Sequence, residues 1–224
     1  MMSTTLYHLP NSRSQRIIWL FEELNIPYDL KVLQQDQSTQ KAHIDKFPTI
    51  HLSDENLWLR ESSAIAEYFC QQQQKLIIPT HEENYWHFCY FKNFADASFM
   101  PNLALKQVFA QIEQQTPWLF RVVSLFFKKA FNHAYLNPEI KQQLDTIEQH
   151  LSDHTWFAGD VISYADILMW FPLQACQHAY PHFEKYTAIQ AYLARIHTRP
   201  AFQVALEKGQ WSSKNFQHYW HITQ

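Results

Sequence analysis

Two pieces of one stretch decide the fold: Phe47-Pro48-Thr49-Ile50 and, after a polar turn, Leu59-Arg60-Glu61-Ser62-Ser63-Ala64-Ile65. They predict a strand that begins at a proline, a second strand over residues 57–59, and a helix whose first turn contains Glu61 and Ser62. A helix N-terminus carries unpaired N–H groups and a partial positive charge, so it favours a bound carboxylate. Glu61 adds an acceptor beside those donors. The combination suits a ligand that has both an ammonium and a carboxylate group.

The composition is that of a folded protein with no sign of nucleic-acid binding. Of the 224 residues, 46% are hydrophobic and 16% aromatic, which is enough to build a core. The formal net charge of -3 gives no basic field, so we expect neither nucleic acid nor a membrane as a partner. Only two glycines occur, which excludes a glycine-rich phosphate loop.

Cysteines and histidines give no metal or disulfide pattern. Cys70, Cys89 and Cys176 lie far apart without a C-x-x-C pair, so we expect a reducing, cytoplasmic location. His150 and His154 are four residues apart but lack the H-E-x-x-H arrangement, so we expect no metal site. The N-terminus has no signal-peptide pattern, and no apolar run is long enough to span a bilayer.

The first third of the chain alternates between strand and helix patterns. Residues 5–9 and 28–33 alternate as strands, and an amphipathic helix begins between them near Ser14, which we expect to be its N-cap. This order predicts a βαβ unit. The polar run 34–46 is expected to be a loop that leads to the ββα unit of the opening stretch.

The rest of the chain is predicted to be all-α. The composition changes after residue 74, so we place a first domain at residues 3–78 and a second at 84–224. Helices are expected over 82–115 with an interruption at Pro101, and over 118–133, 138–151, 192–197 and 201–208. Another helix begins at Ser163, where Asp166 three residues later predicts a capping box and gives Asp166 a structural role.

These features resemble the glutathione transferase superfamily over residues 6–208. The resemblance rests on Asn11-Ser12-Arg13-Ser14-Gln15-Arg16, Phe47-Pro48-Thr49, the segment from Arg60 to Tyr68, and Gly159-Asp160 followed by Ser163-x-x-Asp166. The family combines a thioredoxin-like N-terminal domain, here the βαβ-ββα order, with an all-α C-terminal domain. The resemblance implies glutathione as co-substrate, a small hydrophobic electrophile as second substrate, and a homodimer.

The resemblance also assigns site residues. Pro48 matches the cis-proline of the family, so the backbone of Phe47 is expected to pair with the cysteinyl unit of glutathione. Glu61 and Ser62 match the positions that hold the γ-glutamyl end. The thiol is then expected near Tyr7, Asn11 and Ser12.

The chemistry implied is activation of a thiol. Lowering its pKa from about 8.5 by roughly two units requires about 2.7 kcal/mol. One hydroxyl hydrogen bond to the sulfur anion supplies about 1.5 to 3 kcal/mol, and a helix N-terminus about 0.3 to 1 kcal/mol more. Counted back from Arg16, Ser12 is at the serine-type catalytic position. Asn11 and Tyr7 are the alternatives under other alignments.

The resemblance also leads to predictions about the electrophile pocket, the reaction and the dimer contact. Asp96, Phe99, Met100 and Leu103 are expected to line an apolar pocket between the domains. The expected reaction is conjugation of glutathione to a hydrophobic electrophile, with reduction of organic peroxides as a further activity. The alternatives are a non-catalytic binding or regulatory protein and a glutathione-dependent disulfide reductase. In the homodimer, Trp58 and the helix over 63–69 are expected to face the early helices of the partner's second domain.

Overall fold

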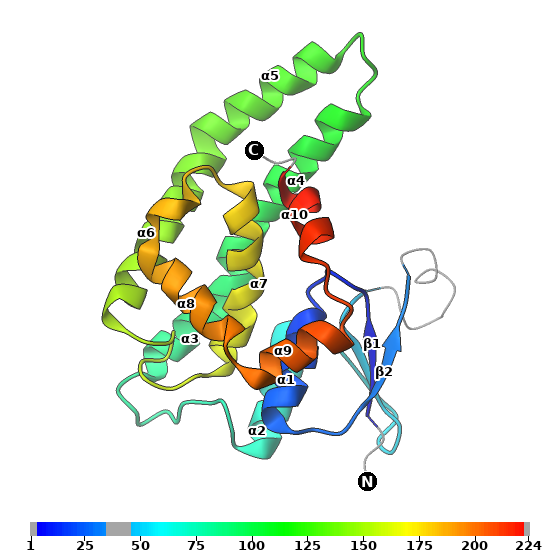
Figure 1. The fold of residues 1–224 in the computed structure, drawn as a ribbon, viewed down its shortest axis with the longest axis vertical. Helices are drawn as coiled ribbons and strands as arrows, with labels where there is room; N and C mark the ends of the chain where they lie inside the picture. The colour runs from blue at the N-terminus through cyan, green and yellow to red at the C-terminus, as the bar shows by residue number, and fades with distance from the viewer. Residues whose placement is uncertain (1–3, 35–45, 222–224) are drawn as a thin grey trace.

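The computed structural model describes residues 4–34 and 46–221, and Figure 1 shows a small sheet with its helices beside a larger helical part. The first part consists of β1 (Thr4–His8), α1 (Gln15–Leu24), β2 (Asp29–Val32), β3 (Thr49–Leu52), β4 (Leu57–Arg60) and α2 (Ser62–Gln73). The strand order is β2-β1-β3-β4, with β1 parallel to β2 and antiparallel to β3. The predicted βαβ-ββα order is confirmed. Most of the predicted loop 34–46 lies outside the described residues.

Strand register brings three separate segments to one end of the sheet. Tyr7 on β1 lies opposite Thr49 on β3, and Thr49 lies opposite Arg60 on β4. The loop that follows β1, the residue Pro48 and the beginning of α2 are therefore neighbours. The opening stretch of the sequence meets the loop before α1 at this end.

The second part is helical, as expected. It contains α3 (Tyr85–Phe94), the π-helical segment η2 (Ala95–Phe99), α4 (Met100–Gln115), α5 (Arg121–Phe131), the π-helical segment η3 (Asn132–Leu136), α6 (Asn137–Asp153), α7 (Tyr164–Ala179), η4 (Phe183–Lys185), α8 (Thr187–His197), α9 (Pro200–Lys208) and α10 (Ser213–His221). Residues 74–84, between the two parts, contain neither helix nor strand. No helix among the described residues has the length and apolarity needed to cross a membrane.

The interruption expected at Pro101 is displaced by a few residues. The α-helical pattern breaks at η2, and Pro101 lies in the first turn of α4, where its missing N–H is not needed. Pro138 likewise lies in the first turn of α6, directly after η3. Together α3, η2 and α4 run up, and α5, η3 and α6 run down, as a long hairpin whose end projects at the top of Figure 1.

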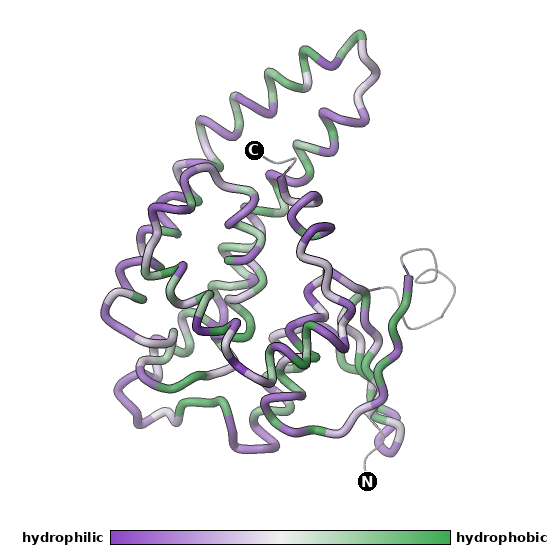
Figure 2. Tube along the Cα trace, viewed as in Figure 1, coloured by the Kyte–Doolittle hydropathy of each residue, from purple (hydrophilic) through white to green (hydrophobic). Residues whose placement is uncertain are grey.

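Helix α7 forms the centre of the helical part, and Figure 2 shows much of its length in the hydrophobic colour. The predicted capping box between Ser163 and Asp166 is present. Asp166 is fully buried and accepts hydrogen bonds from the N–H of Ser163 at 2.8 Å and of Phe157 at 2.9 Å. Burial raises the pKa of Asp166 to about 6, against the effect of these donors. Its structural role is confirmed.

Buried Arg16 joins the two parts. Its Nη1 donates to both carboxylate oxygens of Asp96 on η2, at 3.0 and 3.2 Å, and to the carbonyl oxygen of Leu168 on α7 at 3.1 Å. Burial lowers the pKa of Arg16, and the charge of Asp96 raises it. Glu23 on α1 adds a second tie by accepting from Arg199 at 2.6 and 2.8 Å.

Candidate functional site

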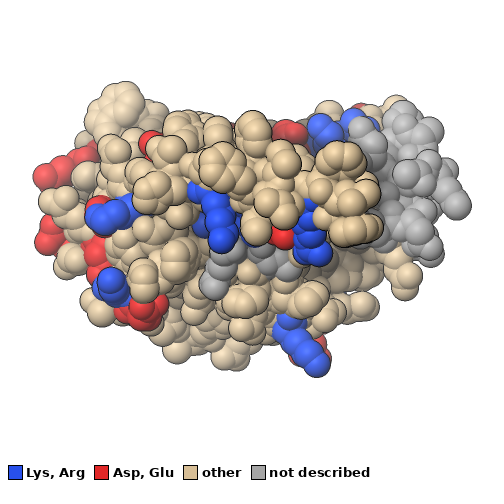
Figure 3. Space-filling view, turned by 90° about the horizontal axis from the view of Figure 1, so that it is seen from above, with Lys and Arg blue, Asp and Glu red and all other residues tan. Residues whose placement is uncertain are grey.

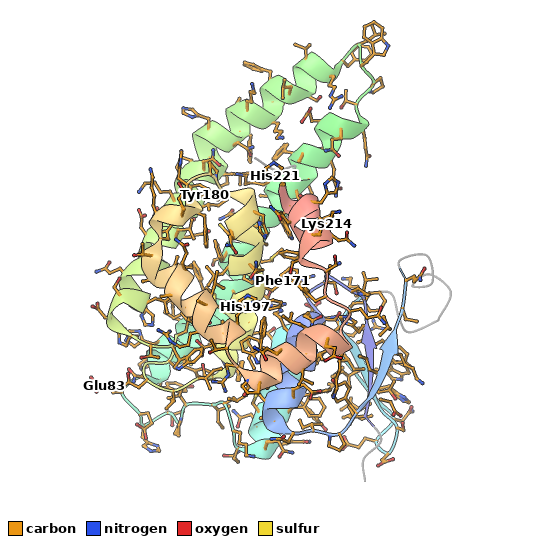
Figure 4. All side chains as sticks on the ribbon, viewed as in Figure 1. Glu83, Phe171, Tyr180, His197, Lys214 and His221 are labelled. Atoms are coloured by element: carbon orange, nitrogen blue, oxygen red, sulfur yellow. The ribbon has the colours of Figure 1, made fainter. Side chains whose placement is uncertain are left out.

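A cavity of about 540 Å³ opens between the loop after β1 and helices α4, α7 and α10. Its lining residues are Leu9, Pro10, Asn11, Ser12, Arg13, Met100, Ala104, Gln107, Val108, Gln111, Phe171, Asn215, Phe216, Tyr219 and Trp220. Figure 4 labels Phe171 on α7, and its ring packs edge-on against Phe216 of α10, with centroids 5.4 Å apart. The walls are mostly apolar, and the main polar edge is the loop that contains Ser12.

Ser12 is the first member of a chain of hydrogen bonds that runs into the core. Its Oγ lies 2.7 Å from the Oγ of Ser14, which lies 2.8 Å from Nδ1 of His8. Nε2 of His8 lies 2.8 Å from the carbonyl oxygen of Gly209, at the end of α9. A carbonyl only accepts, so Nε2 carries the proton and donates it. Burial lowers the pKa of His8 to about 4, so the imidazole is neutral near pH 7.

This tautomer fixes the direction of the whole chain. Nδ1 of His8 is unprotonated and lies 2.8 Å from the Oγ of Ser14, whereas the other acceptor, the carbonyl oxygen of Leu9, lies at 3.3 Å. Nδ1 is therefore the better acceptor for the one hydroxyl proton of Ser14. Ser14 is then an acceptor for the hydroxyl of Ser12, and also for the N–H of Leu9 at 3.2 Å. In the free protein the proton of Ser12 therefore points to Ser14, and donation to a sulfur anion requires the hydroxyl to rotate.

His8 does not have the strength to remove the proton of a thiol. With a thiol pKa of about 8.5 and an imidazole pKa of about 4, the transfer is uphill by roughly 6 kcal/mol. We conclude that His8 and Ser14 position Ser12. Sequence reasoning missed His8, although its place on the buried side of β1, in line with Leu6, was a signal.

Ser14 occupies the N-cap position of α1, but it makes no side-chain cap hydrogen bond. Its hydroxyl is taken by His8, Leu9 and Ser12. The predicted N-cap position of Ser14 is confirmed. Its side chain does not cap the helix, because the hydroxyl turns to the loop before α1 instead of to the first turn of α1.

Asn11 lies in the cavity wall with its side-chain oxygen occupied. Oδ1 accepts from the N–H of Ser212 at 2.8 Å, just before α10, and the backbone of Asn11 has a φ of 57°. Asparagine tolerates this left-handed conformation better than most residues. Asn11 thus fixes the loop and holds the start of α10 over the cavity.

Tyr7 is not brought to the cavity. Side chains alternate along β1, so the buried side of the strand carries Leu6 and His8 while Tyr7 lies on the other side. Its ring stacks on Trp58, with centroids 6.0 Å apart, and Trp58 stacks on His51 at 4.1 Å. Tyr7 therefore lies on the face of the sheet opposite to His8, and it is not among the residues that line the cavity.

Phe47, Pro48, Glu61 and Ser62 lie at the same end of the sheet as the Ser12 loop, by the strand register described above. The peptide bond between Phe47 and Pro48 is cis, as the resemblance implied. Glu61 is exposed and has a φ of 68°, which is uncommon for a residue with a side chain, and Ser62 is buried in the first turn of α2. Such backbone outliers are found preferentially at ligand sites.

The apolar pocket differs from the one predicted. Met100 lines the cavity, but Phe99 and Leu103 are fully buried behind it and Asp96 is bound to Arg16. The π-helical segment η2 changes the direction of the following side chains, which sequence periodicity does not reveal. The face of α4 toward the cavity consists of Met100, Ala104, Gln107, Val108 and Gln111.

Helix α10 completes the cavity and was not predicted. It buries Phe216 and Trp220, four residues apart, and its remaining positions are mostly polar. Two apolar positions are too few to show a period. The amide of Gln107 on α4 donates to the carbonyl oxygen of Tyr219 at 3.1 Å and holds this helix in place.

Comparison with known proteins gives one consistent family. Residues 6–75 match the model of the glutathione S-transferase N-terminal domain, and residues 84–200 match that of the C-terminal domain. The chain is 31% identical over 211 residues to a protein named glutathione S-transferase 3 from Schizosaccharomyces pombe, covering 91% of this chain and 86% of that protein. It is 25% identical to glutathione S-transferase 1 from Saccharomyces cerevisiae, covering 94% and 97%.

Solved structures agree. A glutathione S-transferase from Actinobacillus pleuropneumoniae has a TM-score of 0.73 at 26% identity, covering 92% of this chain and 93% of that chain. A glutathione transferase homolog from Lodderomyces elongisporus, described with two GSH per subunit, has the same fold, with a TM-score of 0.73 at 16% identity and coverage of 92% and 99%.

Proposed function

This chain belongs to the glutathione S-transferase family, and we propose that it transfers the thiolate of glutathione to a small hydrophobic electrophile held in the cavity beside Ser12. Reduction of an organic peroxide by the same thiolate is part of the proposal. The main observation in support is that two features lie at the same end of the sheet. One is the hydroxyl of Ser12 on the wall of an apolar cavity, and the other is the N-terminus of α2, flanked by Glu61.

Glutathione is proposed to bind across these features. Its γ-glutamyl carboxylate accepts from the first N–H groups of α2 and the hydroxyl of Ser62, and Glu61 accepts from its ammonium group. The backbone of Phe47, held by the cis-peptide before Pro48, pairs with the cysteinyl unit. This arrangement directs the sulfur to the loop that contains Ser12.

Ser12 is proposed to stabilise the sulfur anion. Its hydroxyl leaves Ser14 and donates to the thiolate, and the positive end of α1 adds to the stabilisation. Exchanging the bond to Ser14 for a bond to a full negative charge is favourable, because charge-assisted hydrogen bonds are about twice as strong as neutral ones. Tyr7 is a less suitable donor, because it lies on the other face of the sheet. The bond of Asn11 to Ser212 uses only the acceptor Oδ1, so the NH₂ group of Asn11 is the alternative donor in the cavity wall.

The electrophile is proposed to occupy the apolar part of the cavity. A volume of about 540 Å³ is in the range of small-molecule sites. Met100, Val108, Phe171 and Trp220 offer apolar contacts, and the arrangement holds the electrophilic carbon within attack distance of the sulfur.

The test is the pKa of the bound thiol. Ultraviolet titration of the glutathione complex is expected to give a thiol pKa at least one unit below that of free glutathione. Ser12→Ala should return it to the solution value and lower kcat/KM for a panel of electrophiles and hydroperoxides by about 10- to 100-fold, since about 1.4 to 2.7 kcal/mol of transition-state stabilisation is lost. Tyr7→Phe is the matched control and should change neither quantity.

The non-catalytic alternative has one observation in its favour, the hydroxyl proton of Ser12 that is already donated to Ser14. In that case glutathione would bind with its thiol pKa unshifted and no electrophile would be turned over. If calorimetry at millimolar glutathione showed no heat of binding, both the catalytic proposal and the non-catalytic alternative would be contradicted.

We also propose a homodimer in the reducing cytoplasm, where glutathione is available. Trp58 is half-buried on the side of the sheet that also carries Tyr7, and its neighbour Leu59 lines a hollow of about 490 Å³ together with Ser63, Tyr68 and Tyr164. A partner subunit that packs here would cover this aromatic surface. Sedimentation equilibrium of the protein and of Trp58→Ser tests the assignment, and a dimer weakened by this change is the expected result.

A further inference from the structure

The end of the α4–α5 hairpin presents an apolar surface that no described part of the chain covers. We define the apolar tip as Trp118, Leu119, Phe120, Val122, Phe126 and Phe127, whose exposed fractions lie between 63% and 81%. Figure 1 shows that this end of the hairpin stands clear of the rest of the molecule. Exposed apolar patches of this kind mark sites where a protein meets another protein or a membrane.

Helix α5 has the reverse of the usual polarity. In a helix of a water-soluble protein the apolar stripe faces inward. In α5 the side chain of Lys128 is buried, 3.4 Å from Glu113 of α4, while Val122, Phe126 and Phe127 face outward. The two helices therefore contact each other partly through charged groups, and the apolar side chains of α5 are exposed on the outer face.

A second apolar feature opens at the same place. A groove of about 340 Å³ between α4 and α5 is lined by Phe109, Ile112, Thr116, Phe120, Val123, Ser124 and Phe127. Two of these, Phe120 and Phe127, belong to the apolar tip. The tip and the groove form one continuous surface that suits flexible hydrocarbon chains.

The charge around the tip has the opposite sign to that of the whole chain. Within residues 107–133, Arg121, Lys128 and Lys129 are basic and Glu113 is acidic. The carboxylate of Glu113 is paired with Arg121 at 3.2 Å and with Lys128, so the charge that the hairpin presents is positive. Figure 3 looks down on this end and shows mostly uncharged surface, with Lys and Arg across the middle and most acidic groups toward the left edge.

We propose that the apolar tip inserts into the interfacial layer of an anionic lipid membrane. Phe126 and Val122 enter the acyl boundary, Trp118 lies at the headgroup level that tryptophan prefers, and Arg121 and Lys129 contact anionic headgroups. The 11 residues of α5 extend about 16 Å, roughly half the hydrocarbon thickness, so the hairpin lies in the interface and does not cross the bilayer.

Charge favours lipid over a second copy of the chain as the occupant. Two tips packed on each other would bring their basic groups together, whereas anionic headgroups neutralise them. The sequence expectation of no membrane partner relied on the net charge of -3, which hides this local reversal. The proposal is independent of the transferase activity.

The experiment is flotation of the purified protein with two kinds of vesicle. One is made of phosphatidylcholine alone, and the other contains roughly 30% phosphatidylglycerol as the anionic lipid. The protein should bind the anionic vesicles and bind phosphatidylcholine at least tenfold more weakly. Trp118→Ser combined with Phe126→Ser should lower binding to anionic vesicles more than tenfold. Val161→Ser is the matched control, because Val161, in the loop before α7, is 59% exposed and distant in sequence both from the tip and from the helices of the proposed dimer contact. It should bind as the wild type does.

Charge variants test the second half of the proposal. Arg121→Gln and Lys129→Gln should each weaken binding to anionic vesicles by about fivefold, with the loss reduced in high salt. Lys31→Gln, an exposed lysine on β2, is the control and should have no effect. Circular dichroism and calorimetry with glutathione establish that every variant is folded.

Three outcomes would overturn the proposal. The first is the absence of wild-type binding to anionic vesicles. The second is equal binding by the wild type and the tip double variant. The third is a fall in molar mass on sedimentation caused by the tip variant together with no vesicle binding, which would identify the surface as an interface between copies.

Discussion

His8 is buried and neutral on β1, which makes the free energy of unfolding depend on pH. Its pKa is about 4 in the folded protein and about 6.5 when exposed, so the unfolded chain binds a proton first as the pH falls. The stability that the neutral imidazole provides is fully present above pH 6.5 and is lost as the pH falls toward 4. We expect this loss to reach about 3 kcal/mol.

The measurement is urea unfolding of the wild type and of His8→Gln between pH 7 and 4. The difference between their free energies of unfolding should shrink as the pH falls through this range. Asp166, with its raised pKa of about 6, acts in the opposite direction, but it is present in both proteins and cancels in the difference. His218→Gln, at an exposed position on α10, is the control, and a pH-dependent difference for that variant would contradict the assignment.

The residues that the sequence identified and those it missed differ in the range of their contacts. Ser12, Pro48, Glu61 and Ser62 belong to local motifs, so their positions at turns and helix starts could be read directly. The partner of His8 is Gly209, 201 residues away, and no local pattern announces such a pair. Tyr7 lies on the side of β1 opposite to His8, as alternation along a strand requires, and it does not line the cavity.

At the level of elements, α7 depends on the buried carboxylate of Asp166. Asp166→Asn replaces one acceptor oxygen by an NH₂ group that faces the N–H donors of Phe157 or Ser163. Leaving such a donor unpaired in the core costs about 1 to 3 kcal/mol, with loss of the cap in addition. We expect a fall in the free energy of unfolding of about 2 to 4 kcal/mol at pH 7. Asp160→Asn, at an exposed position in the same loop, should change it by less than about 0.5 kcal/mol.

Element prediction succeeded where the pattern was long and failed where it was short or broken. The capping box at Ser163 and the strands around Pro48 have strong local signals, and they appear within a few residues of the expected places. The segments η2 and η3 insert π-helical turns that a 3.6-residue period cannot represent. The polar residues of α10 form a helix because Phe216 packs on Phe171 and His178 of α7 and because Gln107 of α4 donates to the backbone of Tyr219, which is tertiary information.

For the whole molecule, Arg16 is expected to be the most sensitive link between the two parts. Arg16→Met removes a buried guanidinium that holds Asp96 and the carbonyl oxygen of Leu168. Breaking a buried ion pair from one side costs about 3 to 5 kcal/mol, because the remaining charge stays unpaired. Arg16→Met combined with Asp96→Leu should be less destabilising than the sum of the single changes, as measured by urea unfolding. Additive effects would contradict the pairing.

Gly209 connects the last helices to the Ser12 site, so a single methyl group there tests how far the site depends on the complete fold. A Cβ at this position would lie 2.1 to 2.7 Å from the side-chain amide of Gln15, which is buried and donates to the carbonyl oxygen of Ala205. Because Gln15 cannot move freely, the end of α9 has to shift, and the carbonyl oxygen of Gly209 shifts away from Nε2 of His8.

Gly209→Ala is therefore expected to destabilise the protein by about 1 to 3 kcal/mol and to disturb the direction of the hydrogen-bond chain that ends at Ser12. The readout specific to the site is the pKa of bound glutathione, which should rise toward its solution value although position 209 lies outside the cavity wall. Lys208→Ala is the matched control, because it removes surface contacts with Glu22 and with the ring of Tyr28, worth about 1 kcal/mol, and should leave that pKa unchanged. If the pKa of bound glutathione in Gly209→Ala equalled that in the wild type, Ser12 would be positioned by its own loop alone, without help from the last helices.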